Sequence, residues 1–177
     1  STLYGQAVAS GADMVCFGMQ YVAEDGTVLS EHRAADGGER ELSPAEYLVE
    51  YAADSYAWNK LYRASLFKDS GVRFPPRAWY EDLATVPKVL LSCRRVLLTD
   101  GVFYRYLQRA DSIMHVGNVE RTAEMLDAVD GVLAYYKEQG AFDACVEALE
   151  YLTVLHVLVL ATHRVVSADK RHPLLGR

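Results

Sequence analysis

The stretch ADMVCFGMQYVAEDGTVLSEHR, residues 12–33, decides the fold because it predicts a β-hairpin with a buried first strand. Residues 12–22 form a nearly continuous apolar run rich in Val, Phe, Met and Tyr, which is typical of a strand inside a sheet. Residues 24–27, EDGT, are a turn with glycine at the position that tolerates a positive φ. VLSEHR then returns as a second strand.

Helices are predicted on the C-terminal side of this hairpin. Ser43 suits the N-cap, Pro44 suits the first helical position, and Glu46 closes a capping box, so a helix begins there. RASLFKDSG, residues 63–71, predicts a short helix that ends at its glycine. The apolar spacing in YEDLATVPKVLLSC predicts a longer helix that begins near Glu81.

Two short strands are predicted after this helix, RRVLLTD and GVFYRYLQR, separated by Asp100-Gly101. Residues 34–41, AADGGERE, are expected to be a flexible polar loop. Because strands and helices alternate, residues 1–116 are expected to form a layered sheet of the α/β class.

Residues 117–177 are expected to form a helical extension. Residues 118–140 are amphipathic and residues 141–166 are more apolar, which predicts a C-terminal helical hairpin. Residues 152–161 are the most hydrophobic run in the chain. We expect this run to be a buried helix, since it is short for a membrane span and is interrupted by histidine. The alternative is contact with a partner or a membrane surface.

Composition restricts the classes of function. The net charge of −6 argues against nucleic acid as the main partner. Cys16, Cys93 and Cys145 are far apart and odd in number, which favours reduced thiols in a cytosolic protein over a disulfide framework. No cysteine or histidine spacing indicates a structural metal.

The chain begins with Ser1 and with a segment, TLYGQAVASG, that has the character of a helix. No signal peptide is recognisable near it. We therefore expect the chain to be part of a longer protein, with the missing part on the N-terminal side.

Positive charge is concentrated in the middle of the chain. Residues 58–109 contain ten Lys and Arg against four Asp and Glu, although the whole chain is acidic. This asymmetry suggests a small anionic ligand, and a solvated surface of mixed charge is the competing interpretation.

Glu81 and Asp82 are the candidate acid–base residues. They stand at the start of a predicted helix, where the helix dipole favours ionised carboxylates. An ionised carboxylate at such a junction can serve as a general base if it reaches a substrate hydroxyl. The alternative is that the pair merely stabilises the first helical turn, where acidic residues are common.

Trp58, Asn59 and Lys60 combine a flat apolar face, an amide and a cation, a set that suits a sugar or polyol carrying a phosphate. Arg105 and Arg109 could bind phosphate oxygens, and on one strand they would point to the same side. A turn with one buried indole and a surface ladder of arginines are the competing interpretations.

Taken in order, these stretches resemble the second half of a bacterial family 2 glycosyltransferase domain, the type that builds surface polysaccharides. The resemblance covers about residues 1–116. It is carried by four stretches in succession: ADMVCFGMQYVAEDGTV, AWNKLYRASLF, VRFPPRAWYEDLATVPKVLLSCRRV and VFYRYLQRADSIMH. It implies a partial GT-A fold, which is a Rossmann-like mixed sheet with flanking helices, and sugar transfer from a nucleotide-sugar with inversion.

The resemblance also implies roles for the candidate residues. Asp82 would deprotonate the acceptor hydroxyl, and Glu81 would help to hold the acceptor. The turn at residues 58–60 would line the same cleft, so we expect it to lie within reach of Asp82. Arg105 and Arg109 would lie where a basic side chain meets the departing diphosphate.

One departure from the family's pattern concerns the donor half. The family's nucleotide-binding strand and its DxD metal motif precede the opening helix, and this sequence contains no DxD; Asp13, Asp25 and Asp36 lie in the wrong places. The divalent metal, Mn or Mg, is therefore expected to bind mostly outside this chain, which alone should be inactive.

The implied partners are a nucleotide-sugar donor and a glycan or lipid-linked acceptor, in the cytoplasm or at the inner face of the membrane. Homodimerisation or membrane-surface contact is the role considered for the C-terminal helices, with core packing as the simpler alternative. A truncated, non-catalytic protein-interaction module is the alternative function. A phosphate-binding hydrolase is poorly supported because the sequence has no nucleophile motif, metal cluster or Gly-rich phosphate loop.

Overall fold

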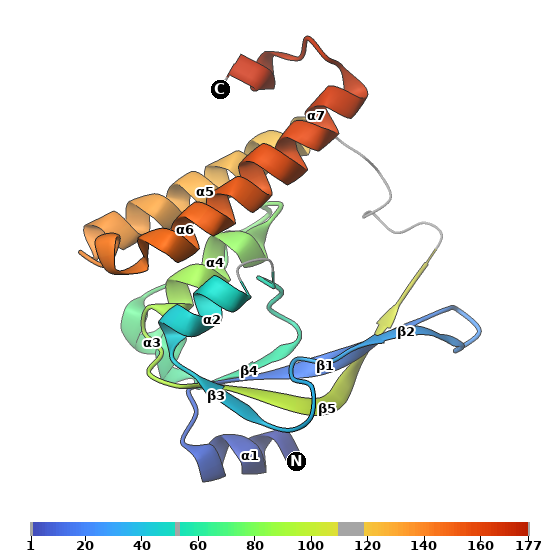
Figure 1. The fold of residues 1–177 in the computed structure, drawn as a ribbon, viewed down its shortest axis with the longest axis vertical. Coiled ribbons are helices and arrows are strands. Elements are labelled where there is room, and N and C mark those ends of the chain that lie inside the picture. Colours follow the sequence, from blue (N-terminus) through green and yellow to red (C-terminus); the bar gives the residue numbers. More distant parts are fainter. Residues whose placement is uncertain (1, 52–53, 110–118, 177) are drawn as a thin grey trace. The chain divides into compact units, whose positions relative to one another are not determined.

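The computed structural model describes residues 2–51, 54–109 and 119–176 (Figure 1). These residues form helices and a mixed sheet, which confirms the predicted α/β class. The chain divides into two compact units. The sheet unit comprises Ser1–Pro44, Tyr56–Ser70 and Ser92–Val116, and the helical unit comprises Ala45–Ser55, Gly71–Leu91 and Gly117–Arg177. The expected division into residues 1–116 and a helical extension of residues 117–177 stays a prediction.

Five strands form the sheet, in the order β2-β1-β5-β3 with β4 paired to β1. They are β1 (Met14–Val22), β2 (Val28–His32), β3 (Arg40–Leu42), β4 (Lys60–Tyr62) and β5 (Val96–Leu107). β5 runs parallel to β1 along one edge, while β4 and then β2 pair antiparallel along its other edge (Figure 1). The predicted hairpin is confirmed, and Gly26 in its turn has a φ of 87°.

The core of the sheet unit is built on the start of β1. Ala12, Val15 and Leu97 are buried together, and the opening helix α1 (Thr2–Ser10) contributes Leu3 and Ala7 to the same cluster. β1 suits the centre of the sheet because its apolar run is buried on both faces, which removes hydrophobic area from water.

The carboxylate of Asp13 joins the three strands that meet at this end of the sheet. Asp13 is 4% exposed, and its Oδ1 accepts a 2.7 Å hydrogen bond from Arg63 Nε, just after β4. Its Oδ2 accepts a 2.9 Å bond from the backbone N–H of Arg94, just before β5. Its own backbone N–H donates to the carbonyl oxygen of Arg95 at 3.0 Å. A buried charge is tolerated here because both oxygens have donors.

The structure corrects the prediction of two strands around Asp100-Gly101. β5 is one continuous strand, and the pair lies in a bulge. β1 advances two residues from Cys16 to Gly18 while its partner positions on β5 advance from Leu98 to Val102. The extra residues are accommodated inside the strand, so a local turn signal is overridden by pairing with β1.

Two further strands were missed in the sequence. β3 lies partly in the segment expected to be a loop, and β4 begins inside the tryptophan turn. Each has three residues, so its extended conformation depends on pairing with β5 or β1 rather than on local propensity.

The predicted helices between the strands are confirmed. α2 (Pro44–Glu50) begins at its proline, and α3 (Ser65–Ser70) ends before Gly71, whose φ is 71°. α4 (Glu81–Leu90) begins at the predicted residue and contains Pro87. The Pro87 carbonyl oxygen accepts a 2.8 Å hydrogen bond from the buried hydroxyl of Tyr136.

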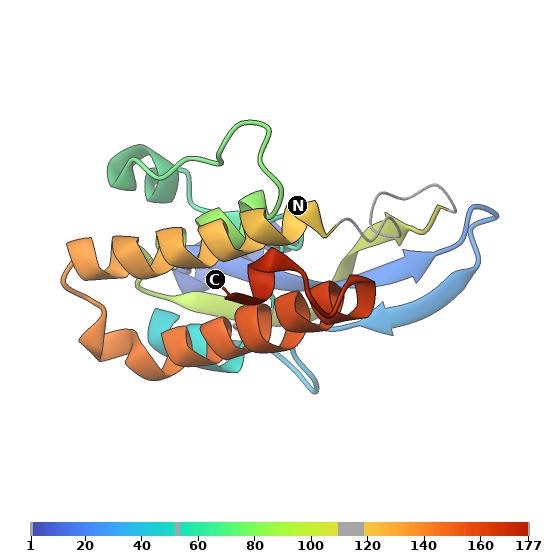
Figure 2. The same ribbon diagram turned by 90° about the horizontal axis from the view of Figure 1, so that it is seen from above.

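The C-terminal region is helical, as predicted. It contains α5 (Glu120–Glu138), α6 (Val146–Thr153), a π-helical segment (Val154–Ala161) and α7 (Thr162–Ala168). Together Asp143–Ala168 form one continuous helix, named the C-terminal helix below. It runs beside α5, and α5 also packs on α4 (Figure 2).

The prediction that residues 152–161 form a buried helix is only half correct. Leu152 and His156 are buried, but Val154, Leu158 and Val159 are 46%, 63% and 51% exposed. The expectation that residues 152–161 are too short and too interrupted for a membrane span stays a prediction. The C-terminal helix that contains this run has 26 residues, and an 18-residue window of it has a mean hydropathy of 1.8, so the helix could cross a membrane by length and composition alone.

We predict that Asp13→Asn lowers the free energy of unfolding by about 3 kcal/mol, at the lower end for a broken buried ion pair because Arg63 is half-exposed. Urea denaturation followed by circular dichroism measures this loss. Arg94→Ala is the matched control. The Arg94 side chain is 89% exposed and only its backbone N–H makes the short bond to Asp13, so the loss should be under about 0.5 kcal/mol. Equal stability of the two variants would contradict the assigned role of Asp13.

Candidate functional site

Trp58 belongs to an aromatic cluster in the sheet unit. Its ring centroid lies 4.6 Å from that of Tyr104 and 5.2 Å from that of Tyr106, and Tyr56 stacks on it at 5.3 Å. Tyr104 and Tyr106 are alternate residues of β5 and therefore share one face of the strand. This cluster, the tryptophan cluster, offers a partly exposed aromatic surface fixed by the sheet.

Asn59 and Lys60 are 2% and 6% exposed. The Lys60 ammonium donates to Asn59 Oδ1 at 2.7 Å and to the Tyr56 carbonyl oxygen at 2.6 Å, while the Asn59 carbonyl oxygen accepts from Phe17 N–H at 3.0 Å. These contacts close the turn and attach it to β1. The structure thus gives Asn59 and Lys60 a role in presenting Trp58, and their contact with a ligand stays a prediction.

Arg105 does not share the face of the tryptophan cluster. It lies between Tyr104 and Tyr106 on β5 and so points to the opposite side, where its Nη2 donates to the Gly26 carbonyl oxygen at 3.1 Å. Arg109 is exposed and follows the end of β5 at Leu107. The expected alignment of the two arginines on one strand is therefore wrong, and their binding of phosphate stays a prediction.

Glu81 and Asp82 occupy the first turn of α4 in the helical unit. Glu81 is exposed and Asp82 is partly exposed, whereas the next residue, Leu83, is buried. Both carboxylates therefore lie at the positive end of the helix dipole.

The loop before this helix has an unusual backbone. Arg77 and Tyr80 have φ angles of 57° and 60°, in the left-handed region that non-glycine residues rarely adopt. Such a conformation costs about 1–2 kcal/mol per residue and persists only where surrounding contacts fix it.

Those contacts come from α5 and α7. Glu124 Oε2 accepts a 2.8 Å hydrogen bond from the Trp79 backbone N–H, and the Arg121 guanidinium carbon lies 3.4 Å from the centroid of the Trp79 ring. Arg164 donates to the Tyr80 hydroxyl and lies over its ring at 5.7 Å. We name Arg121, Glu124 and Arg164 the loop clamp.

The loop clamp was missed in the sequence. Arg121 and Glu124 are three residues apart on an amphipathic helix, a pattern shared with any solvated helix face. The spacing therefore carried no signal, and only the fold shows that both residues contact Trp79. Through these contacts the helices beyond residue 118 position the start of α4.

The candidates for the donor-site metal do not form a ligand set. Asp13 is occupied by Arg63, and Asp25 accepts a 2.9 Å bond from the Thr27 N–H in the hairpin turn, which lowers the pKa of its carboxyl. Across residues 2–51, 54–109 and 119–176, no group of three His, Cys, Asp or Glu is placed to hold a metal. Asp13 and Asp25 therefore do not fit the metal, and metal ligands in the N-terminal half of the expected parent protein stay a prediction.

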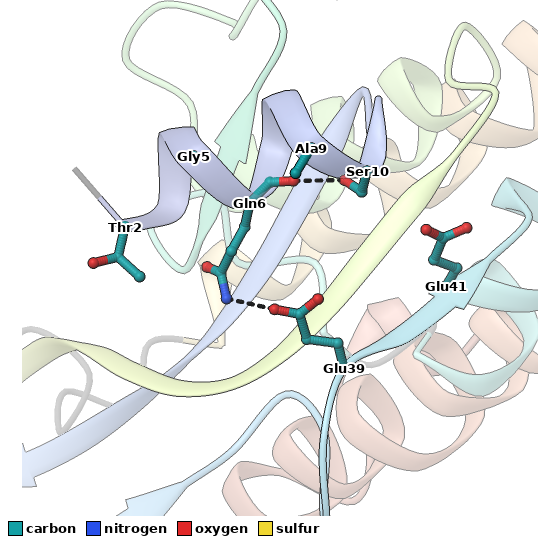
Figure 3. Close-up of a pocket in the computed structure, with 7 residues that line it drawn as sticks. All are labelled: Thr2, Gly5, Gln6, Ala9, Ser10, Glu39 and Glu41. Atoms are coloured by element: carbon teal, nitrogen blue, oxygen red, sulfur yellow. Dashed lines mark hydrogen bonds between the residues drawn. The ribbon is translucent and has the colours of Figure 1, made fainter.

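Two pockets are lined by residues other than the candidate site residues. One, of about 540 Å³, is in the sheet unit, where Gln6 Nε2 donates to Glu39 Oε1 at 2.7 Å (Figure 3). Its lining residues come from α1 and from the segment around β3: Thr2, Gly5, Gln6, Ala9, Ser10, Glu39 and Glu41. The other, of about 320 Å³, lies between α2 and the start of the C-terminal helix. Neither is lined by a predicted site residue.

Comparison with known proteins gives no family assignment. The sequence matches no protein-family model, and no curated protein matches it significantly. Any functional assignment therefore depends on the ordered sequence motifs and on the geometry described above.

We predict that Glu124→Ala increases amide hydrogen exchange in residues 77–82, because Trp79 loses its acceptor and the left-handed loop loses one restraint. The expected cost in global stability is about 1.5–3 kcal/mol, as for a hydrogen bond to a charged group. Hydrogen exchange with mass spectrometry measures the loop directly. Glu124→Gln is the matched control, since it keeps an acceptor oxygen. Unchanged exchange in the alanine variant would show that the clamp does not hold the loop.

Proposed function

We propose that this chain is the acceptor-side half of an inverting family 2 glycosyltransferase with a partial GT-A fold. The observation that carries the proposal is the carboxylate pair at the start of α4, which follows a strained loop held by side chains of α5 and α7. Strained backbone of this kind is concentrated at functional sites, because surrounding structure must stabilise it.

In the proposed reaction Asp82 is the general base. Its carboxylate takes the proton from an acceptor hydroxyl as that oxygen attacks the anomeric carbon of the donor sugar. The bond from this carbon to the nucleoside diphosphate breaks, and the electron pair leaves with the diphosphate. Attack from the face opposite the leaving group inverts the anomeric centre. A positioned base of this kind contributes about 10²–10⁴ in rate.

Glu81 and Trp58 are proposed to orient the acceptor. Glu81 is exposed one position before the base and can accept hydrogen bonds from sugar hydroxyls. The indole of Trp58, fixed by Tyr104 and Tyr106, can stack on the apolar face of a sugar ring. The proposal requires the tryptophan cluster and Asp82 to line one cleft.

The proposed partners are a nucleotide-sugar donor and a glycan or lipid-linked acceptor, consistent with synthesis of a surface polysaccharide in the cytoplasm or at the inner face of the membrane. Ligands for the donor diphosphate and for the expected divalent metal belong to the N-terminal half of the parent enzyme. Arg109 is the residue of this chain proposed to approach the departing diphosphate, because Arg105 points to the face of β5 opposite the tryptophan cluster.

A second candidate function is a non-catalytic interaction module. The observation that favours it is the exposed apolar side of the C-terminal helix, with Leu158 63% and Val159 51% exposed. Large exposed apolar patches mark interaction sites in soluble proteins. This candidate predicts that no substitution of the carboxylate pair changes a sugar-transfer activity.

We predict that Asp82→Asn in the parent enzyme lowers kcat by about 10²–10⁴ while the fold and donor binding are retained. Transfer of a radiolabelled sugar to acceptor measures the rate, and calorimetry measures donor binding. Asp69→Asn is the matched control, because Asp69 is an exposed acid on α3 and the same group is changed. If the Asp82→Asn enzyme kept more than about half of the wild-type rate, Asp82 would not be the base.

A further inference from the structure

The C-terminal helix has one buried and one exposed side, and both are largely apolar. The buried side carries Leu149, Leu152, His156, Ala161 and Val165. The exposed side carries a stripe of large apolar residues, which we name the apolar stripe: Tyr151, Val154, Leu158, Val159 and Val166.

The π-helical segment keeps this stripe on one side of the helix. Buried positions follow one another at four residues, from 152 to 156, then at five, from 156 to 161, and again at four, from 161 to 165. Five-residue spacing is the repeat of a π-turn, so the extra residue is absorbed without rotating the helix against α5. The exposed residues therefore stay on the opposite side throughout.

Charges of opposite sign lie at the two ends of the stripe. Asp143, Glu147 and Glu150 lie at the first end, where Glu147 also lines the 320 Å³ pocket with Glu46 and Glu50 of α2. At the other end Arg164 lies on the helix, and Asp169, Lys170 and Arg171 follow its last residue, Ala168; all four are exposed, and their charges sum to a positive value. Residues 143–163 contain no Lys or Arg, and residues 151–168 contain no Asp or Glu.

We propose that the apolar stripe is the interface with a second copy of this chain, packed antiparallel with a two-fold axis near Leu158. In the sequence Leu158 lies about midway between Glu147 and Lys170, which follows the helix end at Ala168, so an axis near Leu158 places the acidic end of each helix toward the basic end of the other. The same apolar residues then meet their own copies at the centre, as an isologous interface requires.

The charge pattern favours this occupant over others. A parallel pair would bring like charges together at both ends, which is unfavourable. An anionic lipid surface would attract the basic end but repel Glu147 and Glu150 on the same helix. Tyr151 to Val166 spans about 22 Å of helix, less than the roughly 30 Å of bilayer hydrocarbon.

The association should be modest and dependent on salt. One helix pair is a small interface, so we expect a dissociation constant in roughly the micromolar range. The charges at its ends are exposed to solvent, so about 0.5 M salt should screen them and weaken the dimer.

Sedimentation equilibrium of the purified protein over a wide concentration range tests the proposal. The wild type should show monomer and dimer, and Leu158→Glu should be monomeric. Glu147→Lys with Glu150→Lys, and separately Lys170→Glu with Arg171→Glu, should each raise the dissociation constant at least tenfold. The four substitutions together should restore it, since the opposed charges are then exchanged at both ends.

Restored affinity in the fourfold variant distinguishes an antiparallel pair from non-specific hydrophobic association. All the substituted positions are exposed, so the fold should be retained. A wild type that stays monomeric at several hundred micromolar, or a fourfold variant that stays as weak as the double variants, would overturn the proposal. Monomeric protein that sediments with phosphatidylglycerol vesicles would instead assign the stripe to a membrane surface. None of these outcomes depends on glycosyltransferase activity.

Discussion

The sheet depends on one buried carboxylate. Asp13 accepts hydrogen bonds from the Arg63 side chain and from the backbone of Arg94, and its own backbone bonds to residues 63 and 95. These contacts set where β1, β4 and β5 begin relative to one another. Beyond the bulge, β5 pairs in register with β1 from Tyr104 to Leu107, and Tyr104 and Tyr106 lie on the face that receives Trp58. A charge at one end of the sheet thus positions an aromatic surface further along it.

In the helical unit, side chains of neighbouring helices position the start of α4 by holding the loop that precedes it. Glu81 and Asp82 follow this loop, in which two non-glycine residues have a left-handed backbone conformation. Such a conformation persists only where surrounding contacts stabilise it. Arg121, Glu124 and Arg164 hold it from α5 and α7. The C-terminal helices therefore have a structural role on one side, in positioning α4, and leave their other side apolar and exposed.

Local signals predicted the elements that depend on local chemistry. Gly26, Pro44 and Gly71 set a turn, a helix start and a helix end, and all three act as predicted. The misses depended on long-range pairing. Asp100-Gly101 resembles a turn until β1 pairs across it, and β3 and β4 are strands because of their partners. Tertiary packing likewise determines the buried contacts of Asn59 and Lys60, the direction of Arg105 and the loop clamp. Residue types alone do not encode this packing.

The proposed function requires that the tryptophan turn and the Glu-Asp pair form one site. A pulsed electron–electron distance measurement between spin labels at Ala57→Cys and Glu81→Cys tests it, with Cys145→Ser removing the partly exposed native thiol. Cys16 and Cys93 are buried. Burial, together with the nearby Asp13 and Cys16, raises the pKa of the Cys93 thiol to about 12. Little thiolate is therefore available there for labelling. The account predicts a narrow distribution at the short end of the measurable range, whereas a long or broad distribution would show that the two stretches do not share a cleft.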